Sequence, residues 1–368
     1  MELGSGTFYF RPQNNVVLAA GSRYKYTVKV NATGLTLDGC TIGDWADGGS
    51  ESGEAEDLGY SIQNDGSYTV YNADGLMNVA ELVNGGKTDI NITLDKNIDL
   101  TGKDWTPIGT DYDNSYTGTF DGGGHTITGL TVTTNDEYAG LFGYLGNFGN
   151  AAATVKNVVM DGIQITCNHR LGYAGGVAGF SWGTIENCSV SGSISGTVSV
   201  GGVVGAQRDG SITGCSSSAT VKGTLNVGGV AGQTSFGATL TACYATGNVI
   251  IEIDRTQNIS GGGLVGFNDG ISLLSCYATG NVTSTGSGTG VHIGGFLGDN
   301  YTTLTACYWK NNHEQGIGYN RRSTEATKVD GTSVTWKNAV DAMNTALQNA
   351  GSEWRYELNG ALPTLRKQ

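Results

Sequence analysis

Five short turns in the middle of the chain carry the side chains best suited to binding chemistry. Each turn follows a glycine-rich block, and together the turns hold aromatic rings, amides and charged groups: Phe180, Trp182, Gln207, Arg208, Asp209, Phe236, Phe267, Asn268, Asp269, Asn300 and Tyr301. Aromatic faces beside amides suit ring stacking and hydrogen bonding to a sugar. If the turns lie above one another, these side chains form one ligand-binding edge. The alternative is that the rings fold back onto neighbouring turns and only fill space.

A second candidate binding surface is the opposite, variable side of the same repeats. Insertions in repeat proteins often lie on a binding face, although they can equally be surface loops without a role. The stretches concerned are 167–173, 250–260 and 283–292.

Carboxylates that could act in catalysis are sparse in this region. Glycoside hydrolysis needs two carboxylates held on one face, and residues 171–310 contain only six acidic side chains: Glu186, Asp209, Glu252, Asp254, Asp269 and Asp299. Three of them follow a glycine block, where they could form an acidic edge or simply face solvent: Asp209, Asp269 and Asp299. His125, in the stretch FDGGGHTITG, reads as a structural turn residue rather than a base. We therefore expect no catalytic step.

Two groups of residues could bind a metal. Aspartates are dense near the first coils and could offer oxygen ligands to Ca²⁺, although their spacing matches neither an EF-hand nor an RTX loop: Asp95, Asp99, Asp111, Asp113 and Asp121. Five cysteines recur at one phase of a repeat: Cys188, Cys215, Cys243, Cys276 and Cys307. They include no CxxC pair and have no histidine in register, so we expect buried apolar residues rather than zinc ligands. The sequence predicts no cofactor and leaves calcium binding open.

An internal repeat determines where the turns lie. The block GGVAG begins at Gly175 and is followed by GGVVG, GGVAG, GGLVG and GGFLG at intervals of 26, 27, 34 and 32 residues. A degenerate earlier copy, AGLFG, begins at Ala139. Around each cysteine, apolar and polar residues alternate, and this period of two predicts strands. A unit this short suits one coil of a parallel β-helix better than a propeller blade of about 40 residues or more.

The composition agrees with stacked coils. Glycine makes up 61 of the 368 residues and charged residues only 14%. Glycine permits tight corners, and like charges stacked in register would repel one another. The net charge of −13 argues against nucleic acid and anionic lipid as partners. The chain has no apolar run of about 18 residues, so we expect no transmembrane segment.

The sequence divides into four parts. We expect strands, an acidic Gly/Ser-rich linker, a capped β-helix, and a segment with irregular structure, a helix and a hairpin cap, at residues 1–50, 51–65, 66–310 and 311–368 respectively. The start, MELGSGTFYF, lacks a signal peptide and reads as the interior of a strand, which is typical of a mature or truncated chain.

Two helices are expected to close the β-helix. The first spans 73–84, with Asn72 as its N-cap and an apolar face that covers the open end. The second spans 335–351 and is expected to close the other end together with the C-terminal hairpin.

The repeat resembles the GLUG motif of bacterial surface proteins. The best copy is GGLVG at 262–266 followed by CYATG at 276–280. The earlier stretches YTVYNADGLMNVAELVN and YTGTFDGGGHTITGL resemble the segment that precedes GLUG repeats in Bacteroidetes surface proteins. The resemblance covers about residues 66–365. It implies a right-handed parallel β-helix that is displayed outside the cell and tethered to the outer membrane.

Residues 1–50 resemble the end of a fimbrillin-like domain, along the stretch from FYFRPQNNVV to GDWADGG. Fimbrillin-like proteins supply stalk and tip subunits of Bacteroidetes pili, and their domains are β-sandwiches. This segment would be the last strands of such a domain. The resemblance implies association with a pilus, with other pilus subunits as partners.

The sequence therefore predicts an all-β protein in which a capped, right-handed parallel β-helix follows a partial β-sandwich. We expect a non-catalytic, adhesin-like cell-surface protein whose rigid β-helix binds a glycan or a host or bacterial surface protein. One alternative is a polysaccharide lyase or hydrolase, which three convergent carboxylates or a Lys/Arg–Asp cluster would favour. Another is a structural spacer in a surface assembly, which the lack of an exposed aromatic stripe would favour.

Overall fold

The computed structural model describes residues 57–368 except 150–152, 254–257 and 271. Before residue 57 it gives the backbone of short strands: β1 (Glu2–Leu3), β2 (Gly6–Thr7), β3 (Tyr9–Phe10), β4 (Tyr24–Asn31), β5 (Gly34–Ile42) and β6 (Glu54–Glu56). Strands β4 and β5 pair in antiparallel fashion, in agreement with the strands expected there. The rest of the predicted fimbrillin-like segment lies outside the described residues, as does Asp254.

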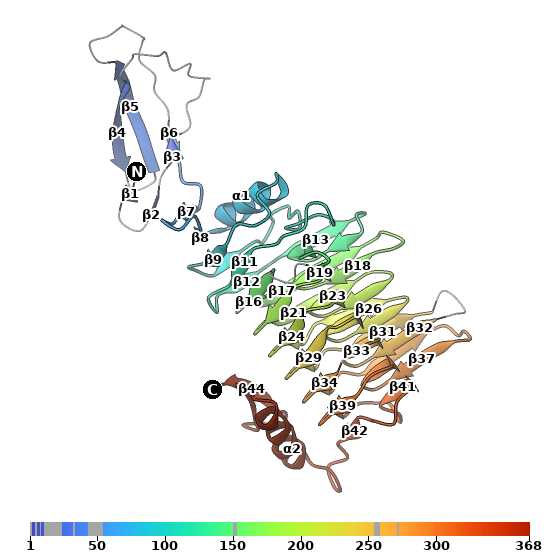
Figure 1. The fold of residues 1–368 in the computed structure, drawn as a ribbon. Helices are drawn as coiled ribbons and strands as arrows, with labels where there is room; N and C mark the ends of the chain where they lie inside the picture. The colour runs from blue at the N-terminus through green and yellow to red at the C-terminus, as the bar shows by residue number, and fades with distance from the viewer. Residues whose placement is uncertain are drawn as a thin grey trace.

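From β7 (Tyr60–Ile62) and β8 (Tyr68–Val70) onward, the chain winds into a β-helix (Figure 1). Within the described ranges its coils build four sheets, and every pairing in these sheets is parallel except that of β7 with β8. Each strand pairs with its equivalents in the neighbouring coils, because successive coils repeat the same sequence pattern. The predicted parallel β-helix is confirmed.

Two of the sheets meet at the glycine blocks. Six strands precede the corner: β14 (Tyr138–Ala139), β18 (Tyr173–Gly175), β22 (Ser199–Gly201), β27 (Asn226–Gly228), β32 (Ile259–Gly262) and β37 (Val291–Gly294). Seven strands follow it: β15 (Phe142–Leu145), β19 (Ala178–Ser181), β23 (Val204–Arg208), β28 (Ala231–Ser235), β33 (Val265–Asn268), β38 (Leu297–Asn300) and β41 (Ile317–Asn320). We call them the six-stranded and the seven-stranded sheet.

The other two sheets meet at the cysteines. The ten-stranded sheet contains β7 and β8 together with β9 (Ile92–Leu94), β11 (Thr119–Asp121), β16 (Thr154–Lys156), β20 (Thr184–Glu186), β24 (Ser211–Thr213), β29 (Thr239–Thr241), β34 (Leu273–Leu274) and β39 (Leu304–Thr305). The thirteen-stranded sheet contains β10 (Ile98–Asp99), β12 (Thr126–Thr128), β13 (Thr131–Thr134), β17 (Val159–Cys167), β21 (Ser189–Ser195), β25 (Ser216–Ser217), β26 (Thr220–Gly223), β30 (Tyr244–Ala245), β31 (Val249–Glu252), β35 (Tyr277–Ala278), β36 (Val282–Thr285), β40 (Tyr308–Trp309) and β42 (Thr327–Lys328).

The glycine blocks form a corner in which the glycine positions have no room for a side chain. A Cβ on Gly228 would lie 2.7 Å from both Gly266 N and Val265 Cα of the next coil. Such backbone atoms cannot move aside without breaking the stacking of the coils, so glycine is needed where neighbouring coils approach this closely.

The cysteines form a column inside the opposite corner. All five repeat cysteines are buried and unoxidised. The Cys215 thiol donates to Thr213 O at 3.4 Å, and the Cys188 N–H donates to the Cys215 sulfur at 3.4 Å. The residue before each cysteine has a left-handed backbone, which turns the chain: Asn187, Gly214, Ala242, Ser275 and Ala306. The cysteines are therefore small core residues, as predicted.

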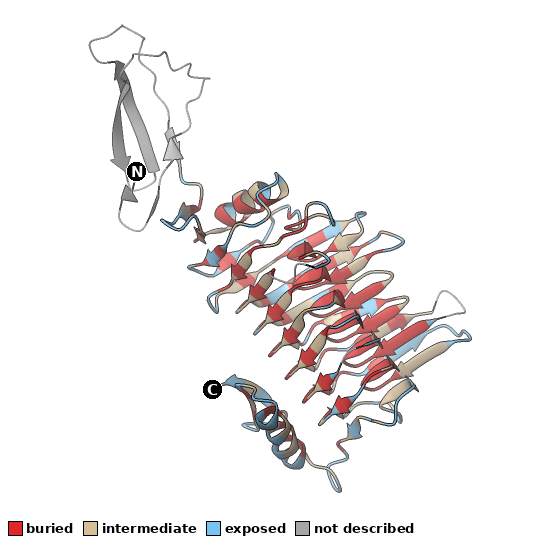
Figure 2. Cartoon of the chain, viewed as in Figure 1, coloured by how far each residue is buried: buried red, intermediate tan, exposed pale blue. Residues whose placement is uncertain are grey.

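Helix α1 (Ala73–Asn84) covers the first coil, and its span is the predicted one (Figure 1). Asn72 Oδ1 accepts a hydrogen bond from Gly75 N at 2.8 Å, which makes it the N-cap. Leu76, Val79 and Val83 are fully buried and join the main core of the β-helix. Figure 2 shows buried residues continuing along the strands of the coils.

Helix α2 (Trp336–Asn349) does not close the far end, contrary to the prediction. It lies alongside the coils, over the cysteine corner, and the hairpin of β43 (Trp354–Glu357) and β44 (Thr364–Lys367) continues back along the same side (Figure 1). Ser275 Oγ donates to Met343 O at 2.9 Å. The reason is an outward column of rings directly after the cysteines, Tyr244, Tyr277 and Tyr308, which the helix and hairpin cover.

Two predicted boundaries are also wrong. The β-helix does not end at residue 310, because β41 pairs with β38 and β42 pairs with β40 to continue the stack. The acidic stretch 51–65 is not entirely linker, because β7 lies within it. In the described part of the chain, no helix has the length and apolar character needed to cross a membrane.

Candidate ligand-binding edge

The predicted turn residues lie at the ends of strands of the seven-stranded sheet or directly after them. Arg208 is in register with Ser235. Backbone hydrogen bonds extend this register beyond the strands, from Asp269 N to Thr234 O, from Tyr301 N to Asn268 O and from Arg321 N to Asn300 O. One side chain per coil therefore stacks in a column, which we call the edge column: Trp182, Arg208, Ser235, Asp269, Tyr301 and Arg321.

The predicted amides do not reach this edge. Gln207, Asn268 and Asn300 are fully buried. The Asn268 Nδ2 amide donates to Asn300 Oδ1 at 2.9 Å, and Asn300 Nδ2 donates to Asn320 Oδ1 at 3.0 Å. Successive strand residues point to opposite faces, and the strands run two or three residues into the predicted turns. These amides therefore stabilise the coil stack, and the prediction that they bind ligand is wrong.

Phe180 and Trp182 are buried as well, as expected under the alternative in which the rings fold back onto neighbouring turns. They are 5% and 7% exposed. The Phe180 ring stacks on Tyr144 with centroids 4.7 Å apart, and Trp182 Nε1 donates to the Tyr144 hydroxyl at 2.9 Å. Burial raises the pKa of Tyr144, so this hydroxyl is protonated at neutral pH. The two rings therefore support other side chains and are not themselves a contact surface.

Three exposed rings pack against the buried rings of Trp182 and Tyr144. Phe148 and Phe236 are 70% and 60% exposed, and their centroids lie 5.4 and 5.7 Å from that of Trp182. Tyr112 is 53% exposed and meets Tyr144 edge-on at 5.9 Å. We call Tyr112, Phe148 and Phe236 the aromatic patch. Only Phe236 was predicted, because the other two come from earlier coils whose blocks depart from the GGxxG pattern.

A cation and unsatisfied polar atoms adjoin the aromatic patch. The Arg208 guanidinium lies 5.2 Å from the Phe180 centroid and 5.5 Å from that of Phe236. Among the described residues, three buried polar side-chain atoms have no hydrogen-bond partner: Gln207 Oε1, Arg208 Nε and Ser235 Oγ. Arg208 and Ser235 are neighbours in the edge column. Buried polar atoms are normally satisfied, so these three atoms are exceptions within the described residues.

A second cluster, which we call the C-terminal cluster, lies near the last coils. The Asp299 carboxylate is buried, accepts a hydrogen bond from Ser260 Oγ and lies 2.8 Å from His292 Nδ1. The His292 ring stacks on Tyr319 at 4.7 Å. Arg321 lies 5.1 Å from the Tyr301 centroid, and its Nε donates to the Tyr319 hydroxyl at 3.1 Å.

The remaining predicted turn residues are two aromatic residues and three aspartates. Phe267 and Tyr301 are half-buried and contact each other, with centroids 5.5 Å apart. Asp209 and Asp269 are exposed, whereas Asp299 points into the C-terminal cluster. The three aspartates therefore do not form one acidic edge.

Three of the five predicted calcium ligands, Asp99, Asp111 and Asp121, have other partners. Asp111 Oδ1 accepts hydrogen bonds from Asp113 N and Asn114 N at 3.0 Å, and Asp121 pairs with Lys156 at 3.3 Å. Within the described ranges, no group of three or more His, Cys, Asp or Glu side chains is arranged to hold a metal ion. On the variable side, residues 283–290 are exposed, and residues 254–257 lie outside the described ranges.

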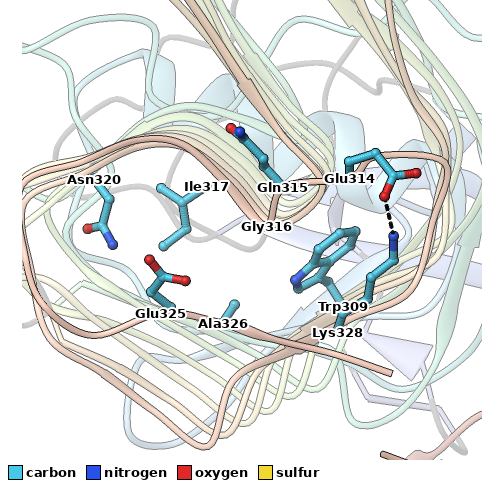
Figure 3. A pocket seen from close by; sticks show the side chains of 9 residues that line it. All are labelled: Trp309, Glu314, Gln315, Gly316, Ile317, Asn320, Glu325, Ala326 and Lys328. Atoms are coloured by element: carbon cyan, nitrogen blue, oxygen red, sulfur yellow. Dashed lines mark ion pairs between the residues drawn. The ribbon is translucent and has the colours of Figure 1, made fainter. Parts of the chain in front are cut away.

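A polar cavity of about 500 Å³ opens at the last coil (Figure 3). Trp309 and Ile317 contribute to its lining, together with Glu325. Lys328 lies 4.7 Å from the Trp309 ring centroid and 3.5 Å from the Glu314 carboxylate. Because Lys328 covers the indole and Trp309 is only 2% exposed, this cavity offers less aromatic surface than the aromatic patch does.

Comparisons with known proteins agree with the repeat pattern. A model described as fimbrillin-like matches residues 1–45, and the GLUG motif matches residues 171–195, 196–222 and 257–283. The chain is 39% identical over 123 residues to halomucin from Haloquadratum walsbyi. It is 34% identical over 130 residues to a "Putative Gly-rich membrane protein" from Evansella cellulosilytica. These matches cover 31% and 33% of the chain but only 1% and 14% of the relatives.

One solved structure shares the fold along most of the chain. It is the crystal structure of a "putative immunoglobulin A1 protease" from Bacteroides ovatus, with a TM-score of 0.60. The match covers 83% of this chain and 93% of that one at 18% identity, so it shows the fold alone. Together these comparisons identify the chain as a parallel β-helix with GLUG motifs that follows a fimbrillin-like segment.

Proposed function

We propose that this chain is the binding part of a cell-surface protein and that the aromatic patch holds a glycan without a catalytic step. The fimbrillin-like segment, the GLUG motifs and the names of the two relatives support a surface location. Tethering to an outer membrane and association with a pilus remain predictions from the resemblance.

The observation that carries the proposal is the exposure of three rings at one place. Large apolar side chains on a soluble surface favour contact with a partner when they gather in a patch. Phe148 and Phe236 rest on the buried Trp182, so the rings are held in place before a ligand arrives. The guanidinium of half-buried Arg208 lies beside the Phe236 ring and can donate hydrogen bonds to sugar hydroxyls.

A glycan array tests the proposal. The intact chain is expected to bind at least one class of glycan, and Phe148→Ala combined with Phe236→Ala is expected to weaken that binding about tenfold or more. Leu358→Ala is the matched control, because Leu358 is an exposed apolar residue outside the patch. No glycan bound by the wild type, or equal binding by the double variant, would remove the patch from consideration. A ligand found only among surface proteins would support the protein-binding version.

A polysaccharide-degrading enzyme is the second candidate, and the Asp299–His292 pair is the observation that favours it. A buried carboxylate that holds one imidazole nitrogen leaves the other free to act as a base. Release of reducing ends or unsaturated sugars by the wild type but not by His292→Gln would establish catalysis. The spacer alternative is disfavoured by the exposed aromatic patch.

A further inference from the structure

We propose that the C-terminal cluster binds the carboxylate of an acidic sugar, so that the ligand on this edge is an acidic glycan. The inference rests on the proposed function, because it assumes that the edge holds a glycan. It adds the chemical class of the sugar and a second contact point for it.

The first observation is that Arg321 and Arg322 are exposed and have no acidic side chain within ion-pair distance among the described residues. Some exposed cations in the described ranges pair with carboxylates, as in Lys222 with Glu252 and Lys337 with Asp341, whereas others, such as Lys87 and Arg170, do not. Neither Arg321 nor Arg322 forms an ion pair with a described residue. Arg322 Nε donates instead to Tyr301 O at 2.7 Å.

The second observation is that aromatic rings hold the Arg321 guanidinium in place. Its Cζ lies 5.1 Å from the Tyr301 centroid and 5.6 Å from that of Tyr319. Within the described ranges, Nε is the one guanidinium nitrogen that forms a hydrogen bond, to the Tyr319 hydroxyl. Both terminal nitrogens therefore lack partners among the described residues, and a fixed guanidinium with two free nitrogens matches the two oxygens of a carboxylate.

The third observation is the imidazole beside this guanidinium. His292 stacks on the same Tyr319 ring, and the buried Asp299 carboxylate accepts its Nδ1–H. The other ring nitrogen, Nε2, has no partner among the described residues and is available for a hydrogen bond. An acidic sugar carries hydroxyls next to its carboxylate, so one of them can form a hydrogen bond with His292 while the carboxylate binds Arg321.

The register of the coils places a second cation in line with the first. Arg208 and Arg321 both belong to the edge column, four coils apart, which is about 19 Å at about 4.8 Å per coil. Asp269 lies between them and is exposed. It repels a carboxylate placed opposite it, so the column favours a chain whose negative groups fall at its two arginines.

Polygalacturonate and its methyl ester provide the test, because the two polymers share a backbone and differ in carboxylate charge. Polyglucuronate and polymannuronate, each with its own ester, extend the test to other uronic acids. At least one acid polymer is expected to bind about tenfold more tightly than its ester, and this preference should weaken with added salt. The preference should vanish in Arg321→Gln combined with Arg322→Gln and survive partly in Arg321→Lys, which keeps the charge but loses the planar fork.

The matched control combines Lys337→Gln with Arg366→Gln, which removes two exposed charges away from the edge column. Thermal unfolding of all variants checks that the fold is kept. If no acid polymer binds more tightly than its ester, or if the control removes the preference equally, the inference is overturned. Binding of neutral glycans that depends on Phe148 and Phe236 would then leave the proposed function standing, whereas loss of all glycan binding would end both.

Discussion

At the scale of single residues, the buried thiols make the interior sensitive to alkaline pH. Burial raises the pKa of Cys215 and Cys276 well above the usual range for a thiol. A thiol in the unfolded chain ionises near pH 8.5. Above that pH the unfolded state therefore binds fewer protons than the folded state, and the free energy of unfolding falls as pH rises.

We therefore expect the urea midpoint of unfolding to fall between about pH 8 and pH 10. The fall should be smaller in Cys215→Ala combined with Cys276→Ala. A thiol-specific reagent should label neither cysteine in the folded protein and both in urea. Rapid labelling without denaturant would contradict the placement of the column inside the coil.

The glycine corner makes a second prediction at this scale. Gly228→Ala would press a methyl group against Gly266 N and Val265 Cα, which belong to the backbone of the next coil. We expect a loss of about 3 kcal/mol in the free energy of unfolding, the size typical of overpacking. Gly360→Ala is the control, because nothing lies within 4 Å of its added Cβ and its backbone is ordinary. Similar stability of the two variants would show that the coils can separate locally.

How far the site could be predicted depended on where each strand ends. Arg208, Phe236 and Tyr301 were placed correctly on one edge because the repeat fixes which coil each belongs to. Gln207 was misplaced because β23 runs through Arg208, and the alternation of the strand turns Gln207 inward. Tyr112 and Phe148 contact the rings of the next coils only after folding, and no pattern in their own stretches signals that contact.

At the scale of elements, the two helices differ in how far their sequence reveals their position. Both spans were predicted closely, because periodic apolar residues mark both helices and Asn72 marks the start of the first. The position of α1 was also predicted, because the first coil has an open end and the apolar face of α1 directly before it can cover that end. The position of α2 did not, because the rings after the cysteines read equally well as exposed residues of a strand.

Trp354 tests the lateral packing of α2 and its hairpin. The indole occupies the space above Gly214, where an added Cβ would lie 2.7 Å from one ring carbon. Trp354→Ala should lower the free energy of unfolding by about 3 kcal/mol and speed hydrogen exchange in β24 and β29. Leu358→Ala, in the same hairpin but exposed, should do neither. Unchanged exchange in these strands would mean that the hairpin contributes little to holding the coils.

At the scale of the whole molecule, stability is the sum of coils and the contacts between them. Deleting residues 201–227 removes one repeat unit and joins Val200 to Gly228, which restores the Val-Gly sequence of the corner. We expect the shortened chain to keep its β-sheet circular dichroism and to unfold at a lower temperature, because α2 and its hairpin then meet a shorter column. Loss of sheet signal would contradict independent stacking. Deleting 214–240, which has the same length but leaves one extra residue before Cys243 at the cysteine corner, is the control.

In the edge column, the number of coils sets the distance between contact points as well as the stability of the molecule. Each coil advances every contact point by one fixed increment, whatever the length of its outer loops. Gain or loss of a repeat between Arg208 and Arg321 would therefore change the distance between two anchors in discrete steps and leave both anchors chemically intact. Proteins with this architecture can therefore adapt to different chain lengths of the same polymer by gaining or losing a repeat.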